Sequence, residues 1–181
     1  MTATVNRRTP LYQGRVFLMV RENVTLDNGV STDLDYIEHP GAAAIVPLIA
    51  PGEILLIRQY RHALKQYIWE VPAGTLDPGE PVMDCARREL IEETGYAAQV
   101  WRKLGEITPV PGYSDERVHL FLAAELTAAR QELDADEVLA VHRMPLARAL
   151  DMITRGEIQD AKSICALLLA QKQLSDPLQA P

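Results

Sequence analysis

The chain has 181 residues, and its 25 Asp and Glu outnumber its 18 Lys and Arg to give a formal net charge of -7 at pH 7. With 48% hydrophobic and 24% charged residues, this length suits one globular domain, or one domain with a small addition. The acidic balance disfavours nucleic acid as a main partner, but it allows a small phosphorylated ligand if divalent cations supply the missing positive charge.

The N-terminal residues 1–40 predict a small antiparallel β unit. They lack the apolar stretch of a signal peptide, and no apolar run in the chain reaches the ~18–20 residues of a membrane-spanning helix, so we expect a cytoplasmic protein without a membrane partner. Strand-like stretches lie at 15–21, 22–26 and 31–37, and Asp-Asn-Gly at 27–29 is a strong hairpin signal. The unit is too small to bury a core alone, so it should pack on the rest of the chain or on a second subunit.

Residues 41–173 predict a single α/β domain. Apolar, β-rich runs indicate strands at 42–49, 53–60, 101–108, 119–126 and 138–143, and helical patterns cover 81–94, 145–155 and 161–173. This order, in which strands enclose one helix and two helices follow, suits an α/β/α sandwich on a mixed sheet. Residues 174–181 are predicted to form a loose C-terminal tail.

The first of these helices has clear ends and a clear apolar side. Turn residues precede it at 77–79, Pro81 suits a first helical position, and Gly95 suits the residue just past a helix end. Helical spacing aligns an apolar stripe of Val82, Cys85, Ala86 and Leu90, with Ile91 at its margin. Cys85, and Cys165 in a similar stripe further on, are therefore expected to be buried thiols rather than a disulfide or a nucleophile.

Three carboxylates crowd the C-terminal end of this helix. Glu89, Glu92 and Glu93 lie within about one turn, and like charges at that spacing destabilise an isolated helix by a few tenths of a kcal/mol per pair. Arg88 can offset the charge of Glu92, four residues on. Glu89 and Glu93 are then left parallel, with the oxygen donors that Mg²⁺ or Mn²⁺ prefer. A solvated acidic face is the alternative interpretation.

Fixed spacings join this helix to the loop before it. Five residues separate Gly74 from Glu80, and seven separate Glu80 from the Arg88-Glu89 pair. An aliphatic residue and one further residue then lead to Glu92 and Glu93. One more residue separates Glu93 from Gly95. This pattern resembles the Nudix box at every fixed position, and only Tyr96 departs mildly, where the family usually has an aliphatic residue. The resemblance extends over about 41–173. It implies a Nudix-type α/β/α sandwich on a mixed sheet and hydrolysis of a nucleoside diphosphate linked to another group.

Sequence outside the box resembles the ADP-ribose pyrophosphatase branch of this family. Pro111 lies sixteen residues after Gly95, Arg61 ends an Arg-Gln-Tyr-Arg sequence ahead of residues 69–74, and an acidic loop follows at 132–137. The resemblance implies that ADP-ribose is split into AMP and ribose 5-phosphate, and that two subunits of a homodimer exchange their N-terminal β units. A rigid turn between strands is the plainer interpretation of Pro111.

Two other functions stay open at the level of the sequence. One is hydrolysis of another sugar nucleotide, such as GDP-mannose, or of a dinucleotide, because a few side chains set the identity of the base, and Tyr12, Phe17 or Tyr36 could stack on it. The other is a catalytically silent Nudix module that only senses a nucleotide, since a fold alone does not prove activity. The intact box carboxylates and Arg88 weigh against this module.

The resemblance also implies roles for the charged residues. The metal ligands would be Glu89, Glu93, Glu92 and the backbone carbonyl of Ala73, while Arg88 orients the carboxylates by charge-assisted hydrogen bonds and Glu80 is structural. The general base, or the last carboxylate that organises the metals, comes from the late acidic loop. There Asp134, Asp136 and Glu137 compete for this role, with Asp136 also a candidate ligand.

Three further residues are candidates for substrate binding. Arg61 is expected to meet the diphosphate, and Glu70, in a strand that leads into the metal loop, is a candidate partner of the metal, a water or the substrate. Glu116 follows Pro111 and matches a glutamate of the branch that accepts hydroxyls of the terminal ribose. Surface or turn positions are the alternatives for Arg61 and Glu116.

Overall fold

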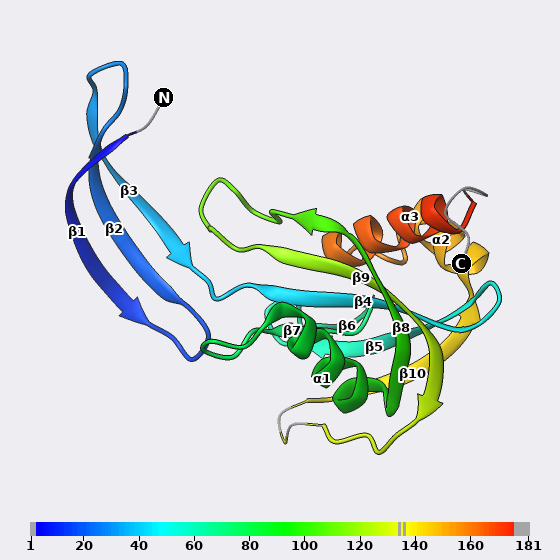
Figure 1. The fold of residues 1–181 in the computed structure, drawn as a ribbon. Helices are drawn as coiled ribbons and strands as arrows, with labels where there is room; N and C mark the ends of the chain where they lie inside the picture. The colour runs from blue at the N-terminus through cyan, green and yellow to red at the C-terminus, as the bar shows by residue number, and fades with distance from the viewer. Residues whose placement is uncertain (1–2, 134, 136, 176–181) are drawn as a thin grey trace. The chain divides into compact units, whose positions relative to one another are not determined.

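A computed structural model describes residues 3–133, 135 and 137–175 of the chain. The chain divides into two compact units (Figure 1). Unit 1 comprises Met1–Gly41 and Thr108–Arg117, and unit 2 comprises Ala42–Ile107 and Val118–Pro181. Within the described residues, no helix combines the length and apolar character that a bilayer crossing requires.

Unit 1 is built on a three-stranded antiparallel sheet. Its strands are β1 (Thr4–Gln13), β2 (Leu18–Thr25) and β3 (Ser31–Glu38), in the order β1-β2-β3. The predicted hairpin joins β2 to β3, and the backbone N–H of Gly29 donates to the carbonyl of Leu26 within its turn. The stretches predicted at 15–21 and 22–26 correspond to one continuous strand that starts later, at Leu18, and ends at Thr25. Strand β1 was not predicted, because all of its residues are exposed and its sequence carries no apolar alternation.

The loop 108–117 is held against the end of β3. The backbone N–H of Ile37 donates to the carbonyl of Tyr113 over 2.8 Å, and the N–H of Asp115 donates to the carbonyl of Ile37 over 3.1 Å. The Asp115 carboxylate in turn accepts from the backbone N–H of His39 over 2.8 Å. A segment distant in sequence therefore completes unit 1.

Unit 2 contains a mixed sheet and three helices. The sheet order is β10-β5-β4-β9-β8, with β6 paired to β5 and β7 paired to β4, and only the β4–β9 pair is parallel among the described pairings. The strands are β4 (Ala42–Ala50), β5 (Glu53–Arg61), β6 (Gln66–Glu70), β7 (Ala73–Thr75), β8 (Tyr96–Ile107), β9 (Val118–Ala128) and β10 (Leu139–Pro145). The helices are α1 (Val82–Thr94), α2 (Leu146–Thr154) and α3 (Ala161–Ser175).

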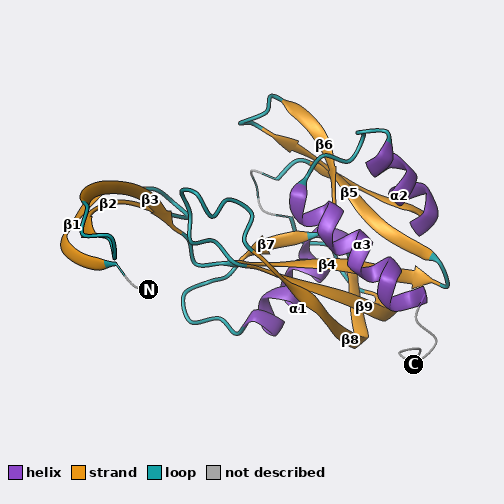
Figure 2. Ribbon diagram, turned by 90° about the horizontal axis from the view of Figure 1, so that it is seen from above, coloured by secondary structure: helices purple, strands orange, loops and turns teal. Residues whose placement is uncertain are grey.

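The helices of unit 2 cover both faces of its sheet. On β4, Ala44 and Val46 belong to the core under α2 and α3, whereas Ala43 and Ile45 belong to the core under α1 (Figure 2). This alternation along one strand produces the three layers, and the α/β/α sandwich on a mixed sheet is confirmed.

The two cysteines lie in different cores of this sandwich. Cys85, on α1, is fully buried, while Cys165, on α3, is half-buried and packs on the opposite face of the sheet, and both are free thiols. Helix α3 extends to Ser175, into the segment predicted as a tail. Residues 176–181 lie outside the described part of the chain.

Candidate active site

Helix α1 carries the acidic cluster, and both of its ends are defined by backbone contacts. Pro81 precedes the first helical residue, and its carbonyl accepts from the N–H of Asp84 over 2.9 Å. At the other end Gly95 adopts the left-handed conformation at φ 72°, which favours glycine, and its N–H donates to the carbonyl of Ile91. Cys85, Ala86 and Leu90 are buried as predicted, and they fix the rotation of the helix on the sheet.

Arg88 lies at the centre of the cluster and contacts three carboxylates. Its Nε and Nη2 donate to Glu80 over 2.9 and 2.8 Å, and its Nη1 donates to Glu89 over 2.6 Å and to Glu92 over 3.0 Å. The Arg88–Glu92 pair expected from the helical spacing therefore forms. The Arg88 hydrogen bonds also lower the pKa of the Glu80 carboxyl from its usual range to about 2.

Glu89 and Glu93 project from α1 toward strand β7. Glu93 is 1% exposed, and its Oε2 accepts from the backbone N–H of Ala73 over 2.7 Å. Glu89 is 7% exposed and lies so close to Gly74 that a Cβ at that position would be 1.8 Å from Glu89 Oε1. Only glycine permits this approach. Burial raises the pKa of Glu89 to about 7, and burial together with the charge of Glu89 raises the pKa of Glu93 well above its usual range.

These two carboxylates fit a divalent cation by their chemistry. Both carboxylates are removed from water, and their negative charges repel each other. A divalent cation bound to them would offset these charges in place of the lost hydration. Among the residues that the structure describes, no group of three or more His, Cys, Asp or Glu side chains is placed to hold a metal. Arg88 is paired with Glu89 and Glu92. The fit therefore rests on the Glu89–Glu93 pair and on the close approach of Gly74.

The late acidic loop reaches this cluster through Glu137. The charge of Glu137 raises the pKa of both Glu89 and Glu93, although by less than burial does. The other two candidates for the general base, Asp134 and Asp136, lie outside the described residues. Gln131, which precedes them, donates from Nε2 to the backbone carbonyl of Glu93 over 2.5 Å and anchors the start of the loop on α1.

Arg61, which is partly exposed, forms an ion pair with the buried Glu70 beside this cluster. Arg61 donates from Nε and Nη2 to the Glu70 carboxylate, with a shortest distance of 2.7 Å. Burial lowers the pKa of Arg61, but the contact with Glu70 and the charge of Glu93 outweigh it and raise that pKa above its ordinary value. Glu70 is 2% exposed, so its carboxylate serves to hold Arg61 rather than to face solvent.

Lys162, which the sequence did not indicate, completes this network. Its Nζ lies 3.2 Å from Glu70 Oε1 and 3.0 Å from Asp160 Oδ2, and its charge lowers the pKa of Glu93. Asp160 also accepts from the backbone N–H of Ser163 over 2.9 Å at the start of α3. Asp is a preferred residue at the start of a helix, so the sequence indicates the role of Asp160 at the start of α3. The approach of Lys162 to Glu70, by contrast, depends on the tertiary fold.

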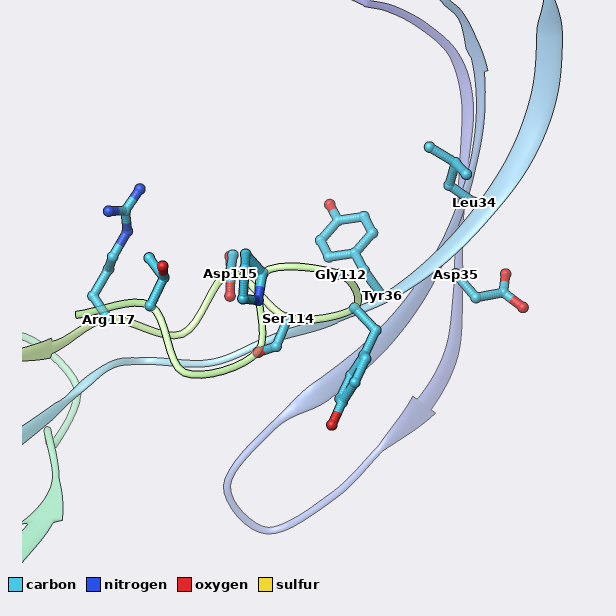
Figure 3. A pocket seen from close by; sticks show the side chains of 10 residues that line it. Leu34, Asp35, Tyr36, Gly112, Ser114, Asp115 and Arg117 are labelled. Carbon is cyan, nitrogen blue, oxygen red and sulfur yellow. The ribbon is translucent and has the colours of Figure 1, made fainter. Parts of the chain in front are cut away.

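Unit 1 has a pocket of its own, with a volume of about 430 Å³, between β3 and the loop that contains Pro111 (Figure 3). It is lined by Leu34, Asp35, Tyr36, Thr108, Pro111, Gly112, Tyr113, Ser114, Asp115 and Arg117. The neighbouring Glu116 has Oε1 3.9 Å from His39 Nδ1. Of the three aromatic residues considered for stacking, Tyr36 lines this pocket, while the rings of Tyr12 and Phe17 lie 6.4 Å apart elsewhere in unit 1.

Comparison with known proteins finds matches over both units. A family model described as the NUDIX domain matches residues 38–167. The ADP-ribose pyrophosphatase of Bacillus subtilis (strain 168) is 38% identical over 172 residues, which cover 94% of this chain and 92% of that protein. The ADP-ribose pyrophosphatase of Mycobacterium tuberculosis (strain ATCC 25618 / H37Rv) is 37% identical over 168 residues, covering 91% and 81%. The crystal structure of an ADP compounds hydrolase aligns with a TM-score of 0.86 and 26% identity, covering 99% of this chain and 98% of that one.

Proposed function

Because this chain belongs to the NUDIX family, we propose that it is a divalent-cation-dependent hydrolase that cleaves the diphosphate bond of ADP-ribose and releases AMP and ribose 5-phosphate. The names of the Bacillus subtilis and Mycobacterium tuberculosis relatives support this substrate, as does the presence of Pro111 and the acidic loop outside the box. The observation that carries the proposal is the buried Glu89–Glu93 pair against Gly74.

The charged residues of unit 2 have different proposed roles in the hydrolysis. Glu89 and Glu93, with Glu92 and the Ala73 carbonyl as further candidates, would hold a cation that neutralises the diphosphate and activates water when it is bound. Arg88 keeps the carboxylates oriented, and its positive charge is paired with them. Arg61, whose Nε and Nη2 are held by Glu70, keeps Nη1 to donate to phosphate oxygens. Glu137, Asp134 and Asp136 are the candidates to accept the proton of the attacking water.

The pocket of unit 1 is lined by groups of the kind that bind a nucleoside. Tyr36 and Tyr113 offer aromatic rings, and Asp35 and Asp115 offer carboxylates that can accept hydroxyl or amino hydrogens. Glu116 is proposed to accept hydroxyls of the terminal ribose. These assignments rest on the lining residues and on the resemblance of the Pro111 segment to the ADP-ribose pyrophosphatases.

We also propose that the protein is a homodimer. Large apolar side chains of unit 1 stand exposed on its strands, including Val5, Leu11, Tyr12 and Leu34, and a second copy of the sheet would cover such a surface. The choice between Mg²⁺ and Mn²⁺, the cytoplasmic location and the absence of nucleic-acid and membrane partners stay predictions from the sequence.

The proposal is tested by initial rates of the purified full-length chain with Mg²⁺ on a panel of substrates. The panel should contain ADP-ribose, GDP-mannose, other sugar nucleotides, dinucleotides and nucleoside triphosphates, with a chelator control. We expect AMP from ADP-ribose at the highest kcat/KM, and no turnover with the chelator. A preference for another sugar nucleotide would replace the substrate and keep the mechanism, whereas nucleotide binding without turnover of any member would favour a sensing module.

A further inference from the structure

Gln59 on strand β5 is a buried polar residue that the chemistry described so far does not use. It is 6% exposed, and its side-chain Oε1 has no hydrogen-bond partner among the described residues. A buried carbonyl without a donor costs free energy, so such groups in folded proteins are usually paired once their ligands or ordered waters are present. We therefore expect Gln59 Oε1 to accept a hydrogen bond from a group that the described residues do not supply.

Strand alternation determines which side of the sheet Gln59 faces. The guanidinium of Arg58 stacks over Tyr67 and Trp69, and Ile54 and Leu56 belong to the core under α2 and α3, so the even-numbered residues of β5 face those helices. Side chains of a strand alternate between faces. Gln59 and Arg61 therefore face the α1 side, which carries the carboxylate cluster.

The neighbours of Gln59 on that side are charged groups of the proposed active site. On one flank, β6 pairs Glu70 with Ile57, so Glu70 and Gln59 share a face, and Arg61 beside them binds Glu70. On the other flank, β10 pairs Leu139 with Gln59, and the N–H of Tyr60 donates to the carbonyl of Val138 over 3.0 Å. Glu137 precedes this pairing directly, and its charge acts on Glu89 and Glu93.

The chemistry of these neighbours limits what can donate to Gln59. Diphosphate oxygens are acceptors and cannot pair with a carbonyl oxygen, whereas a water held with a cation donates O–H bonds. The site is deeply buried, so a small donor fits it better than a sugar ring. A neutral amide oxygen can also accept from such a water without adding negative charge beside a diphosphate.

We propose that Gln59 is a further catalytic residue of the diphosphate hydrolysis, whose side-chain carbonyl accepts a hydrogen bond from a water held with the cation on the α1 side of the sheet. The inference rests on the proposed function for its reaction. It places Gln59 between the diphosphate-facing Arg61 and the loop that supplies the general base. The cation-held water would be the O–H donor that the described residues do not supply.

The matched pair Gln59→Met and Gln173→Met tests this inference. Gln173 on α3 also has an Oε1 without a described partner, and it lies on a helix that covers the opposite face of the sheet, so the same substitution there removes the same kind of atom away from the site. Methionine has a similar volume and no polar group. In the metal-free protein, Gln59→Met should raise the Tm by about 2–4 °C, because an unpaired buried oxygen is removed.

With cation, the two variants should diverge. We expect Gln59→Met to bind Mn²⁺ about 10–100-fold more weakly by titration calorimetry and to lose a similar factor in kcat/KM for ADP-ribose, while Gln173→Met keeps wild-type values of both. Gain of stability together with weaker cation binding identifies a side chain that serves the bound cation, since replacement of a merely structural residue would lower stability and activity together.

Each contrary outcome overturns the inference. Wild-type Mn²⁺ affinity and kcat/KM in Gln59→Met would show that the oxygen receives no catalytic water. A lower Tm, or failure of Gln59→Met to fold, would show that the amide is paired in the protein alone. If the wild-type chain does not hydrolyse ADP-ribose, the proposed substrate falls, and the Mn²⁺ affinities of the two variants still decide the role of Gln59.

Discussion

Arg88 balances the carboxylate cluster from inside and leaves little of its charge for a substrate. Its guanidinium donates to Glu80, Glu89 and Glu92, and its Nη2 also donates to the carbonyl of Thr75 over 3.1 Å. The positive charge that a diphosphate requires must then come from a bound cation and from Arg61. This division separates the residues that build the cluster from those that meet the ligand.

Replacing Glu93 by Gln should separate stability from catalysis. The amide keeps the volume but removes the charge of a proposed metal ligand, so we expect kcat to fall about 10²–10³-fold with the fold retained. Because burial raises the pKa of Glu93, the neutral amide should also stabilise the metal-free protein. Initial rates, circular dichroism and thermal melts measure both effects. Glu157→Gln, at an exposed position, is the control, and ordinary turnover by Glu93→Gln would contradict the metal assignment.

The ionisation of Glu80 should make the free energy of unfolding depend on pH in acidic solution. Its pKa is about 2 in the folded protein and about 4.5 when unpaired, so the unfolded state binds the proton first as the pH falls. The stabilisation is complete above pH 4.5 and is lost as the pH falls toward 2. At pH 7, Glu80→Gln should lower the free energy of unfolding by about 1–3 kcal/mol, and this difference should shrink at pH 3.

Urea unfolding of wild type and Glu80→Gln at pH 7 and pH 3 measures this change. Asp84→Asn is a suitable control, because its ion pair with Arg87 is exposed and should contribute less than about 1 kcal/mol at either pH. An equal difference between wild type and Glu80→Gln at both pH values would mean that the Arg88 contact is not the source of the stabilisation.

At the scale of elements, the site depends on how closely β7 approaches α1. Gly74→Ala would place a methyl group 1.8 Å from Glu89 Oε1, so either the carboxylate or the strand must move. We expect kcat/KM to fall by about tenfold or more, with weaker Mn²⁺ binding, because a metal ligand is displaced. Gly105→Ala, whose new methyl meets only Leu169 at 3.5 Å, is the matched control. Wild-type rates and Mn²⁺ affinity in Gly74→Ala would show that this approach is unimportant.

The elements that could be predicted are those whose sequence carries a local signal. Turn residues, an apolar stripe and Gly95 define α1, and the Asp-Asn-Gly turn defines the β2–β3 hairpin. The short β7 and the wholly exposed β1 lack apolar periodicity, so no local pattern indicates them. They form because a neighbouring strand offers a ladder of hydrogen bonds, which is a tertiary cause.

The candidate site likewise has residues that a local sequence signal indicates and residues that only tertiary packing brings together. The box spacing places Glu89, Glu93 and Arg88 together because they share one helix and the loop before it. Lys162 joins Glu70 from the start of α3, and Gln59 reaches the α1 side through the register of β5 with its two neighbours. Lys162 also meets Asp160, two residues away, but its contact with Glu70 and the position of Gln59 both depend on the packed sheet.

For the whole molecule, the two units hold different parts of the proposed reaction. The carboxylates and Arg61 belong to unit 2, whereas Pro111, Glu116 and the lined pocket belong to unit 1. Deletion of residues 1–40 would remove β3, on which the Pro111 loop is held through Ile37. Such a deletion removes β3 as well as the proposed dimer surface, so point substitutions in β1 test the dimer more cleanly.

The double variant Leu11→Lys/Tyr12→Lys should dissociate the proposed dimer. These side chains are 42% and 61% exposed in the single chain, and charging them would place desolvated ammonium groups in an apolar interface. Light scattering should give the wild type twice the 20.1 kDa of one chain and the variant the mass of a monomer. Leu168→Lys, which charges an exposed leucine of α3, should stay dimeric. If unit 1 supplies the nucleoside pocket across the dimer, the KM for ADP-ribose should rise in the double variant. A monomeric wild type with full activity would remove the second subunit from the mechanism.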